Sequence, residues 1–209
     1  MLFRSKPPTL TWIGCAVAPD PIGLNSVVGL PDGGFLTTNF SPRGTDAAGR
    51  ARMMAGEING ELWEWHTGTG WKIVPGSESA GANGLEISKD GKWLYIGGWG
   101  SQSVIRLSRG QTPVKKDAVG VGFRVDNLRW TPDGALLAAG QGGTAPSQTS
   151  NVAKVDPNTL KFQELVRDPY SDAFSVGTVA IQIGKELWVG SVRGDRIGIF
   201  PAAASPVSR

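Results

Sequence analysis

The chain has 209 residues, and 21 Lys and Arg against 18 Asp and Glu give a formal net charge of +3. Three surplus charges make no basic stripe, and no stretch approaches the roughly 18 apolar residues of a membrane span, so we expect a soluble protein without nucleic-acid or membrane partners. Its single cysteine and single histidine exclude a disulfide framework, a multi-cysteine zinc site and a histidine-rich metal site.

Residues 1–209 are expected to form one domain, whose first element is a strand at 10–18. This apolar segment follows Arg4 and Lys6, an order that faintly resembles a secretory signal peptide. The apolar run is short, and Pro7 and Pro8 interrupt the approach to it, so we favour a strand and find no convincing signal peptide. The cellular compartment stays open.

Four hairpin turns divide the rest of the chain into repeats. Three of them contain Asp-Gly and the fourth contains Gly-Lys, and glycine accepts the positive φ that such turns require. The turn glycines are separated by 58, 43 and 50 residues, and they are Gly33, Gly91, Gly134 and Gly184. That spacing is typical of β-propeller blades of four strands each.

The strands around these turns predict an all-β fold, a β-propeller with about four blades. The predicted blades are 24–74, 83–119, 126–166 and 176–200. The last blade has only three strands. A short helix at 45–56, begun by Thr45 or Asp46, is inserted in the first blade, either as a surface excursion or as a lid wall over one end of the ring. Residues 202–209 are expected to form a flexible tail.

Two glycine-rich segments, 98–100 and 140–143, have the composition of phosphate loops. No helix is expected to follow either of them, as a phosphate loop would require. Both segments are therefore interpreted as loops of the blades.

One position repeats in register in the first strand of each blade. Seven residues before the turn aspartates stand Asn25, Asn83 and Asp126, with Asn127 beside the last, and Val176 holds the equivalent place in the fourth repeat. These strands line the axis of a propeller, so oxygen-bearing side chains converge at one end of its channel. Such oxygens are calcium ligands. Without a metal these side chains would form a polar plug in the channel. Asn also occurs at the start of strands simply because it favours turns, so the pattern has a purely structural explanation as well.

The segments that carry these positions resemble a known group of proteins. Residues 24–28, 82–96 and 125–127 are similar to the calcium-dependent six-bladed β-propeller hydrolases, namely the gluconolactonase and regucalcin group, the paraoxonases and the strictosidine-synthase-like proteins. The sequence Glu-Leu-Trp-Val-Gly at 186–190 is similar to the end of paraoxonase. The resemblance extends from about residue 24 to residue 200.

This resemblance implies a calcium ion held by Asn25, Asn83 and Asp126, with Asn127 added if the site is paraoxonase-like. It also implies hydrolysis of a small-molecule lactone or ester, in which calcium polarises the carbonyl and holds the developing oxyanion. Asp126 would be the catalytic residue, since its carboxylate could assist deprotonation of the attacking water.

The sequence departs from this family in several respects. About four blades stand where six are expected, so the chain resembles the C-terminal part of a larger propeller and lacks the calcium-binding glutamate of the family's first blade. Ser26 stands where a paraoxonase has the aspartate of its second, structural calcium. Alternatively, the strand at 10–18 could complete the last blade and close a four-bladed ring, which would hide both sheet edges.

Two classes of function follow from these observations. The first is a calcium-dependent lactonase or esterase, impaired if an N-terminal portion is missing. The alternative is a non-catalytic propeller that serves as a scaffold or binding module. A metal-free condensation of the strictosidine-synthase type ranks last, because no in-register position holds a glutamate. An open arc would leave apolar blade faces in water, which predicts self-association through the exposed blade edges.

Overall fold

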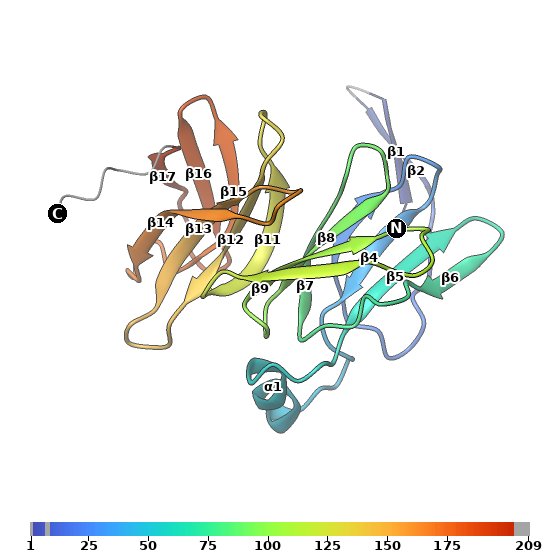
Figure 1. Ribbon diagram of the computed structural model, residues 1–209, viewed down its shortest axis with the longest axis horizontal. Coiled ribbons are helices and arrows are strands. Elements are labelled where there is room, and N and C mark those ends of the chain that lie inside the picture. Colours follow the sequence, from blue (N-terminus) through green and yellow to red (C-terminus); the bar gives the residue numbers. More distant parts are fainter. Residues whose placement is uncertain (1, 7–8, 203–209) are drawn as a thin grey trace.

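The computed structural model describes residues 2–6 and 9–202, which form strands and a helix arranged as an arc of sheets (Figure 1). Three antiparallel sheets contain four strands each, and a fourth contains three. A separate hairpin pairs β1 (Leu2–Lys6) with β2 (Thr9–Gly14). Within each larger sheet the strands follow chain order from one edge to the other, and we call these sheets blades 1 to 4.

The blades contain the following strands. Blade 1 comprises β3 (Leu24–Gly29), β4 (Phe35–Asn39), β5 (Glu61–His66) and β6 (Gly70–Ile73), and blade 2 comprises β7 (Ala82–Ile87), β8 (Trp93–Gly98), β9 (Ser103–Ser108) and β10 (Lys116–Gly120). Blade 3 comprises β11 (Arg124–Trp130), β12 (Leu136–Gly142), β13 (Thr149–Val155) and β14 (Phe162–Pro169), and blade 4 comprises β15 (Gly177–Ile183), β16 (Glu186–Ser191) and β17 (Gly198–Pro201). The predicted all-β fold of four-stranded repeats is confirmed, and the assignment of the whole chain to one domain stays a prediction.

The helix expected at 45–56 is α1 (Ala47–Met54). Of the two candidate caps, Asp46 is the N-cap, and its carboxylate accepts a hydrogen bond from the backbone N–H of Gly49 at 2.7 Å. Thr45 instead donates to the carbonyl of Pro42 at 2.6 Å. Among residues 2–6 and 9–202, no helix has the length and hydrophobicity needed to cross a bilayer.

The strand expected at 10–18 is present as β2, but its partner is β1. Blade 4 keeps three strands, so closure of a four-bladed ring by this strand is wrong for the described residues. Pairing of β2 with the adjacent β1 is favoured over pairing with blade 4, because closing a short hairpin costs much less chain entropy than a contact across nearly the whole chain. Of the tail expected at 202–209, all but Ala202 lies outside the described residues.

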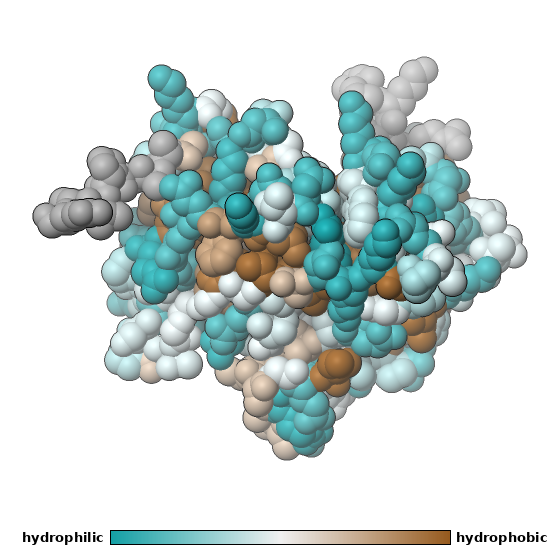
Figure 2. Space-filling model, viewed as in Figure 1, coloured by the Kyte–Doolittle hydropathy of each residue, from teal (hydrophilic) through white to brown (hydrophobic). Residues whose placement is uncertain are grey.

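Apolar layers fill the space between consecutive blades. In β12, Leu136 and Ala138 pack toward blade 2, whereas Leu137 and Ala139 pack toward blade 4, as the alternation of a pleated strand requires. Brown side chains gather near the middle of the view in Figure 2, where Figure 1 places β11 to β13. We call the face of a blade toward the preceding blade its trailing face, and the opposite face its leading face.

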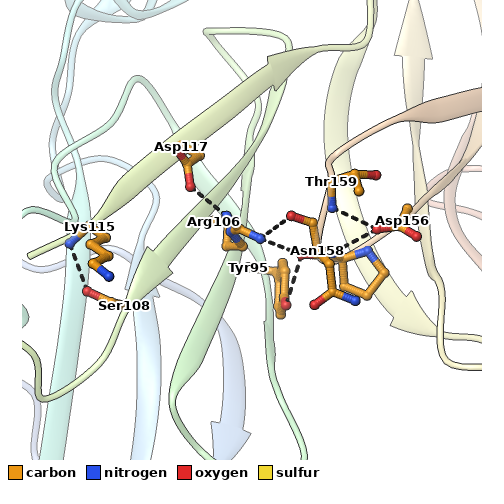
Figure 3. Close-up of polar contacts among 9 residues, drawn as sticks. Tyr95, Arg106, Ser108, Lys115, Asp117, Asp156, Asn158 and Thr159 are labelled. Atoms are coloured by element: carbon orange, nitrogen blue, oxygen red, sulfur yellow. Dashed lines mark hydrogen bonds and ion pairs between the residues drawn. The ribbon is translucent and has the colours of Figure 1, made fainter.

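Polar contacts also tie blade 2 to the loop between β13 and β14 (Figure 3). Arg106 donates to the carboxylate of Asp117 at 2.7 Å, to the carbonyl of Pro157 at 3.3 Å and to the carbonyl of Asn158. The Tyr95 hydroxyl donates to the same Pro157 carbonyl at 3.2 Å. These contacts help to hold blade 3 against blade 2.

Arg109, which follows β9, makes a similar tie between blade 2 and blade 1. Its Nε and Nη2 donate to the two carboxylate oxygens of Glu64 at 3.0 and 2.7 Å, and Nη2 also donates to Asp32 at 3.1 Å. The hydrogen bonds from Arg109 hold the pKa of Glu64 below its ordinary value, against the opposite effect of burial. His66, with Nε2 at 2.7 Å from Glu64 Oε1, lowers that pKa further.

Arg109→Met is expected to lower the free energy of unfolding by about 2 kcal/mol at pH 7, because Glu64 is left half-buried without its charged partner. The pKa of Glu64 is depressed in the native state from an ordinary value of 4.5. The stability from this pair is therefore present above that pH and is lost as the pH falls through the native pKa. Urea titrations should show the difference shrinking as the pH falls below the ordinary value of 4.5.

The matched control is Arg43→Met, which removes an exposed ion pair with Asp20. Exposed pairs contribute little, so this variant should stay within about 0.5 kcal/mol of the wild type. A destabilisation by Arg109→Met that did not change with pH would contradict the role given to Glu64.

Candidate functional site

The first strand of every blade contains a β-bulge at the same place. Near the start of β3 and β7 the ladder to the next strand skips two residues opposite a single residue of that strand, and near the start of β11 and β15 it skips one residue. A bulge takes the extra residue out of the ladder and redirects its side chain. The first skipped residues in the four blades are Asn25, Asn83, Asp126 and Thr178.

The fourth equivalent position is therefore Thr178, and its assignment to Val176 is wrong. The count from the turn failed because the glycine stands at a different place in the turn of blade 4. Gly184 is the first residue of a two-residue turn between β15 and β16, whereas Gly134 is the last of the three residues between Thr131 and Ala135. Counting back the same number of residues from the turn glycine therefore gives a position two residues too early in blade 4.

The bulges line one cleft with a volume of about 970 Å³. The structure brings all four predicted residues to its wall, with Asn25 exposed, Asn83 buried, and Asp126 and Asn127 half-buried. Their roles as metal ligands and the role of Asp126 in catalysis stay predictions. Among the described residues, α1 contributes nothing to this wall. The wall also includes residues that the turn count does not single out, namely Phe40, Trp99, Gln141, Tyr170, Asp172 and Arg193.

Blades 2 and 3 meet closely at the cleft because Gly84 has no side chain. A Cβ atom on Gly84 would lie 2.6 Å from the carbonyl oxygen of Asp126 and 2.8 Å from the Cα of Asn127. The carbonyl of Asn83 accepts a hydrogen bond from Thr38 Oγ1 at 2.8 Å, so blade 1 is tied to the same point. Asn83 and Gly84 lie inside β7, so this Asn-Gly pair serves close packing of strands instead of a turn.

Both carboxylate oxygens of Asp126 accept hydrogen bonds from carboxamides. Gln141 Nε2 lies 2.9 Å from Oδ2, and Asn127 Nδ2 lies 3.0 Å from Oδ1. Burial raises the pKa of Asp126 above its ordinary value, while hydrogen bonds from Gln141 and Asn83 act in the opposite direction. Within the described part of the chain Asp126 has no ion-pair partner. The hydrogen-bond donors to its carboxylate are therefore neutral carboxamides.

Gln141 is a site residue that sequence reasoning missed. Its glycine neighbours suggested a loop, but β12 continues through Gly142 and the Gln141 side chain is buried. Its carboxamide accepts from Trp99 Nε1 at 3.0 Å and donates to the carbonyl of Gly177 at 3.2 Å. The feature of the sequence that could have indicated Gln141 is its place as a polar residue next to the apolar stretch of a strand.

The groups around Asp126 fit a hard cation such as calcium. Asn83 Oδ1 is buried and accepts no hydrogen bond from the described residues. Such an acceptor costs roughly 1–3 kcal/mol, and a cation would satisfy it and neutralise the carboxylate beside it. Asn127 differs, because its Nδ2 donates to Asp126 and to the carbonyl of Thr178, so it supports the carboxylate. No group of three His, Cys, Asp or Glu residues suited to a metal occurs within 2–6 and 9–202, so a cation here needs carboxamide oxygens.

No protein-family model matches the sequence, and no curated protein matches it. Solved structures do resemble it. A Bacteroides fragilis protein provisionally assigned as a 6-phosphogluconolactonase has a TM-score of 0.56 and 16% identity, covering 86% of this chain and 51% of that one. Regucalcin from Agrobacterium tumefaciens, described as a calcium-binding protein, has a TM-score of 0.53 and 17% identity, covering 82% and 54%. Streptogramin B lyase has a TM-score of 0.53 and 12% identity, covering 91% and 69%.

The chain thus spans about half the length of the first two of these structures. At identities this low, the likeness shows the fold alone. Together with the four consecutive antiparallel sheets, it establishes a partial β-propeller, as the spacing of the turns predicted.

Proposed function

We propose that the protein is a calcium-dependent hydrolase of lactones or esters and that its site is the cleft at the bulges. The observation that carries this proposal is the buried Asn83 Oδ1, which has no partner among the described residues, next to an Asp126 carboxylate with only neutral partners. Two similar structures support it, since regucalcin is described as calcium-binding and the Bacteroides fragilis protein is provisionally assigned as a lactonase.

Asn25, Asn83 and Asp126 would hold the ion, one residue from each of three successive blades. When bound, calcium supplies polarisation of the substrate carbonyl and stabilisation of the developing oxyanion. Asp126 is the one acid among the bulge residues, so its carboxylate would accept the proton of the attacking water.

Neighbouring residues would position these groups. Gln141 and Asn127 hold the two carboxylate oxygens of Asp126, and Gln141 connects them to the indole of Trp99. The rings of Trp99 and Tyr170 belong to the cleft wall, where they offer an apolar surface to the body of a substrate.

A non-catalytic binding module is the second candidate. The observation in its favour is that both oxygens of Asp126 already accept amide hydrogen bonds, as expected of a polar plug between blades. This candidate predicts that neither calcium nor a chelator changes the stability of the protein.

The purified 209-residue chain should unfold at a higher temperature in calcium than in chelator. An ion that binds only the native state stabilises it by about 2.7 kcal/mol at 100 times its Kd. Hydrolysis of simple five- and six-membered lactones and of phenyl acetate should be followed in the same buffers, with magnesium as the matched control. Calcium-dependent turnover supports the proposal. Calcium stabilisation without turnover would support a calcium site but contradict the hydrolase, and identical unfolding in calcium and chelator would contradict a calcium site and support the non-catalytic module.

A further inference from the structure

At each end of the arc, one face of the terminal blade lacks a neighbouring blade, although the corresponding faces of the other blades are buried. Three times along the chain, the leading face of one blade packs on the trailing face of the next. Blade 1 and blade 4 lie at opposite ends of the molecule (Figure 1). Among the described residues, no blade therefore covers the trailing face of blade 1 or the leading face of blade 4.

The leading face of blade 4 carries an apolar row that crosses the sheet. Ile181 pairs with Trp188, and Trp188 pairs with Ile199. The residues on either side of Trp188 in β16 are buried against blade 3, so this row points away from blade 3. Ile181 and Ile199 are 43% and 55% exposed, and the exposed Ile183 and Ile197 extend the surface.

The trailing face of blade 1 is largely aromatic. Phe35 stacks on Trp65 with ring centroids 5.3 Å apart, and it meets Trp71 edge-on at 5.4 Å. Val27 and Ile73, at the two ends of the adjacent row, are 66% and 51% exposed. That row runs from strand to strand through Val27, Thr37, Trp63 and Ile73.

We propose that the leading face of blade 4 docks on the trailing face of blade 1 in a second copy of this chain. The chain therefore presents one uncovered face of each of the two kinds that meet in its three internal interfaces. Exposed apolar side chains gathered on one face of a sheet mark interaction sites.

The contact joins two different surfaces, so it is heterologous. Such contacts either close into a ring or continue from copy to copy. In both cases the 209-residue chain should show a molar mass at least twice 22.0 kDa by light scattering or sedimentation at tens of micromolar. A wild-type protein that stays monomeric at these concentrations overturns the proposal.

Two double variants test which faces meet. Ile181→Lys with Ile199→Lys places charge on the leading face of blade 4, and Val27→Lys with Ile73→Lys places charge on the trailing face of blade 1. Each double variant alone should be monomeric, because every contact needs one face of each kind. Equal amounts of the two should form a heterodimer, because each retains the face that the other has lost. Association of the Val27 and Ile73 variant with itself would instead indicate pairing of two blade 4 faces and would overturn the proposal.

Ile58→Lys is the matched control, because Ile58 is 64% exposed and lies outside both faces. Its molar mass should equal that of the wild type. Circular dichroism and thermal unfolding of every variant show whether the fold is retained, and all five substituted positions are exposed on the surface. A control that dissociates like the face variants would attribute the effect to charge alone and would contradict the assigned faces.

Discussion

Gly84→Ala is expected to reduce the free energy of unfolding by about 3 kcal/mol or more, a large part of the 5–15 kcal/mol that stabilises a typical domain. The added Cβ would lie 2.6 Å from the Asp126 carbonyl oxygen and 2.8 Å from the Asn127 Cα. Both atoms belong to the backbone of β11, which the apolar layer between blades 2 and 3 holds in place. The strand must therefore shift, since no side chain can rotate away.

Gly120→Ala in β10 is the matched control, because no atom lies within 4 Å of the Cβ that it would add. It should change stability by less than about 0.5 kcal/mol. Urea titration of both variants measures the difference directly. A Gly84→Ala protein within about 1 kcal/mol of the wild type would show that β7 and β11 can separate without loss of packing.

Asp126→Asn is expected to remove the calcium-dependent rise in unfolding temperature and to reduce lactone or ester turnover at least about 100-fold. The substitution keeps the size of the side chain but removes the only negative charge among the bulge residues. It also places an amide nitrogen against Gln141 or Asn127, both of which donate to the present carboxylate. Unfolding measured in chelator separates the loss of binding from any loss of folding.

Asp172→Asn removes the same charge from the wall of the same cleft, at an exposed position outside this hydrogen-bonded group. It should keep both the calcium response and the turnover. If Asp172→Asn abolishes the response while Asp126→Asn preserves it, the cation site lies elsewhere in the cleft.

The repeated blades could be predicted from the sequence because their turns are local. An Asp-Gly pair between two apolar stretches determines a hairpin without reference to the rest of the chain. The positions of Asn25, Asn83 and Asp126 followed from the same count, since the bulge lies at a constant distance from the turn in blades 1 to 3. Thr178 could not be found in this way, because Gly184 is the first residue of its turn whereas Gly134 is the last residue of its own, which changes the count without any change in the strand.

Contacts between strands were harder to predict. Gln141 meets Asp126 only because β11 and β12 pair with a bulge between them, and no local pattern reports that register. The close approach of Gly84 to β11 likewise depends on the packing of two blades. The partner of β2 could not be chosen for a related reason, since strand patterns indicate where strands lie but leave their pairing undetermined.

The bulges separate the chemistry of the cleft from the architecture that presents it. A residue outside the ladder can be exchanged while the pairing on both sides of it is preserved. The chain shows this freedom, because the same slot holds Asn in two blades, Asp in a third and Thr in the fourth. A few substitutions at these bulge positions could thus replace one set of ligands by another while the fold is unchanged. The bulges are therefore a natural starting point for the evolution or redesign of new activities.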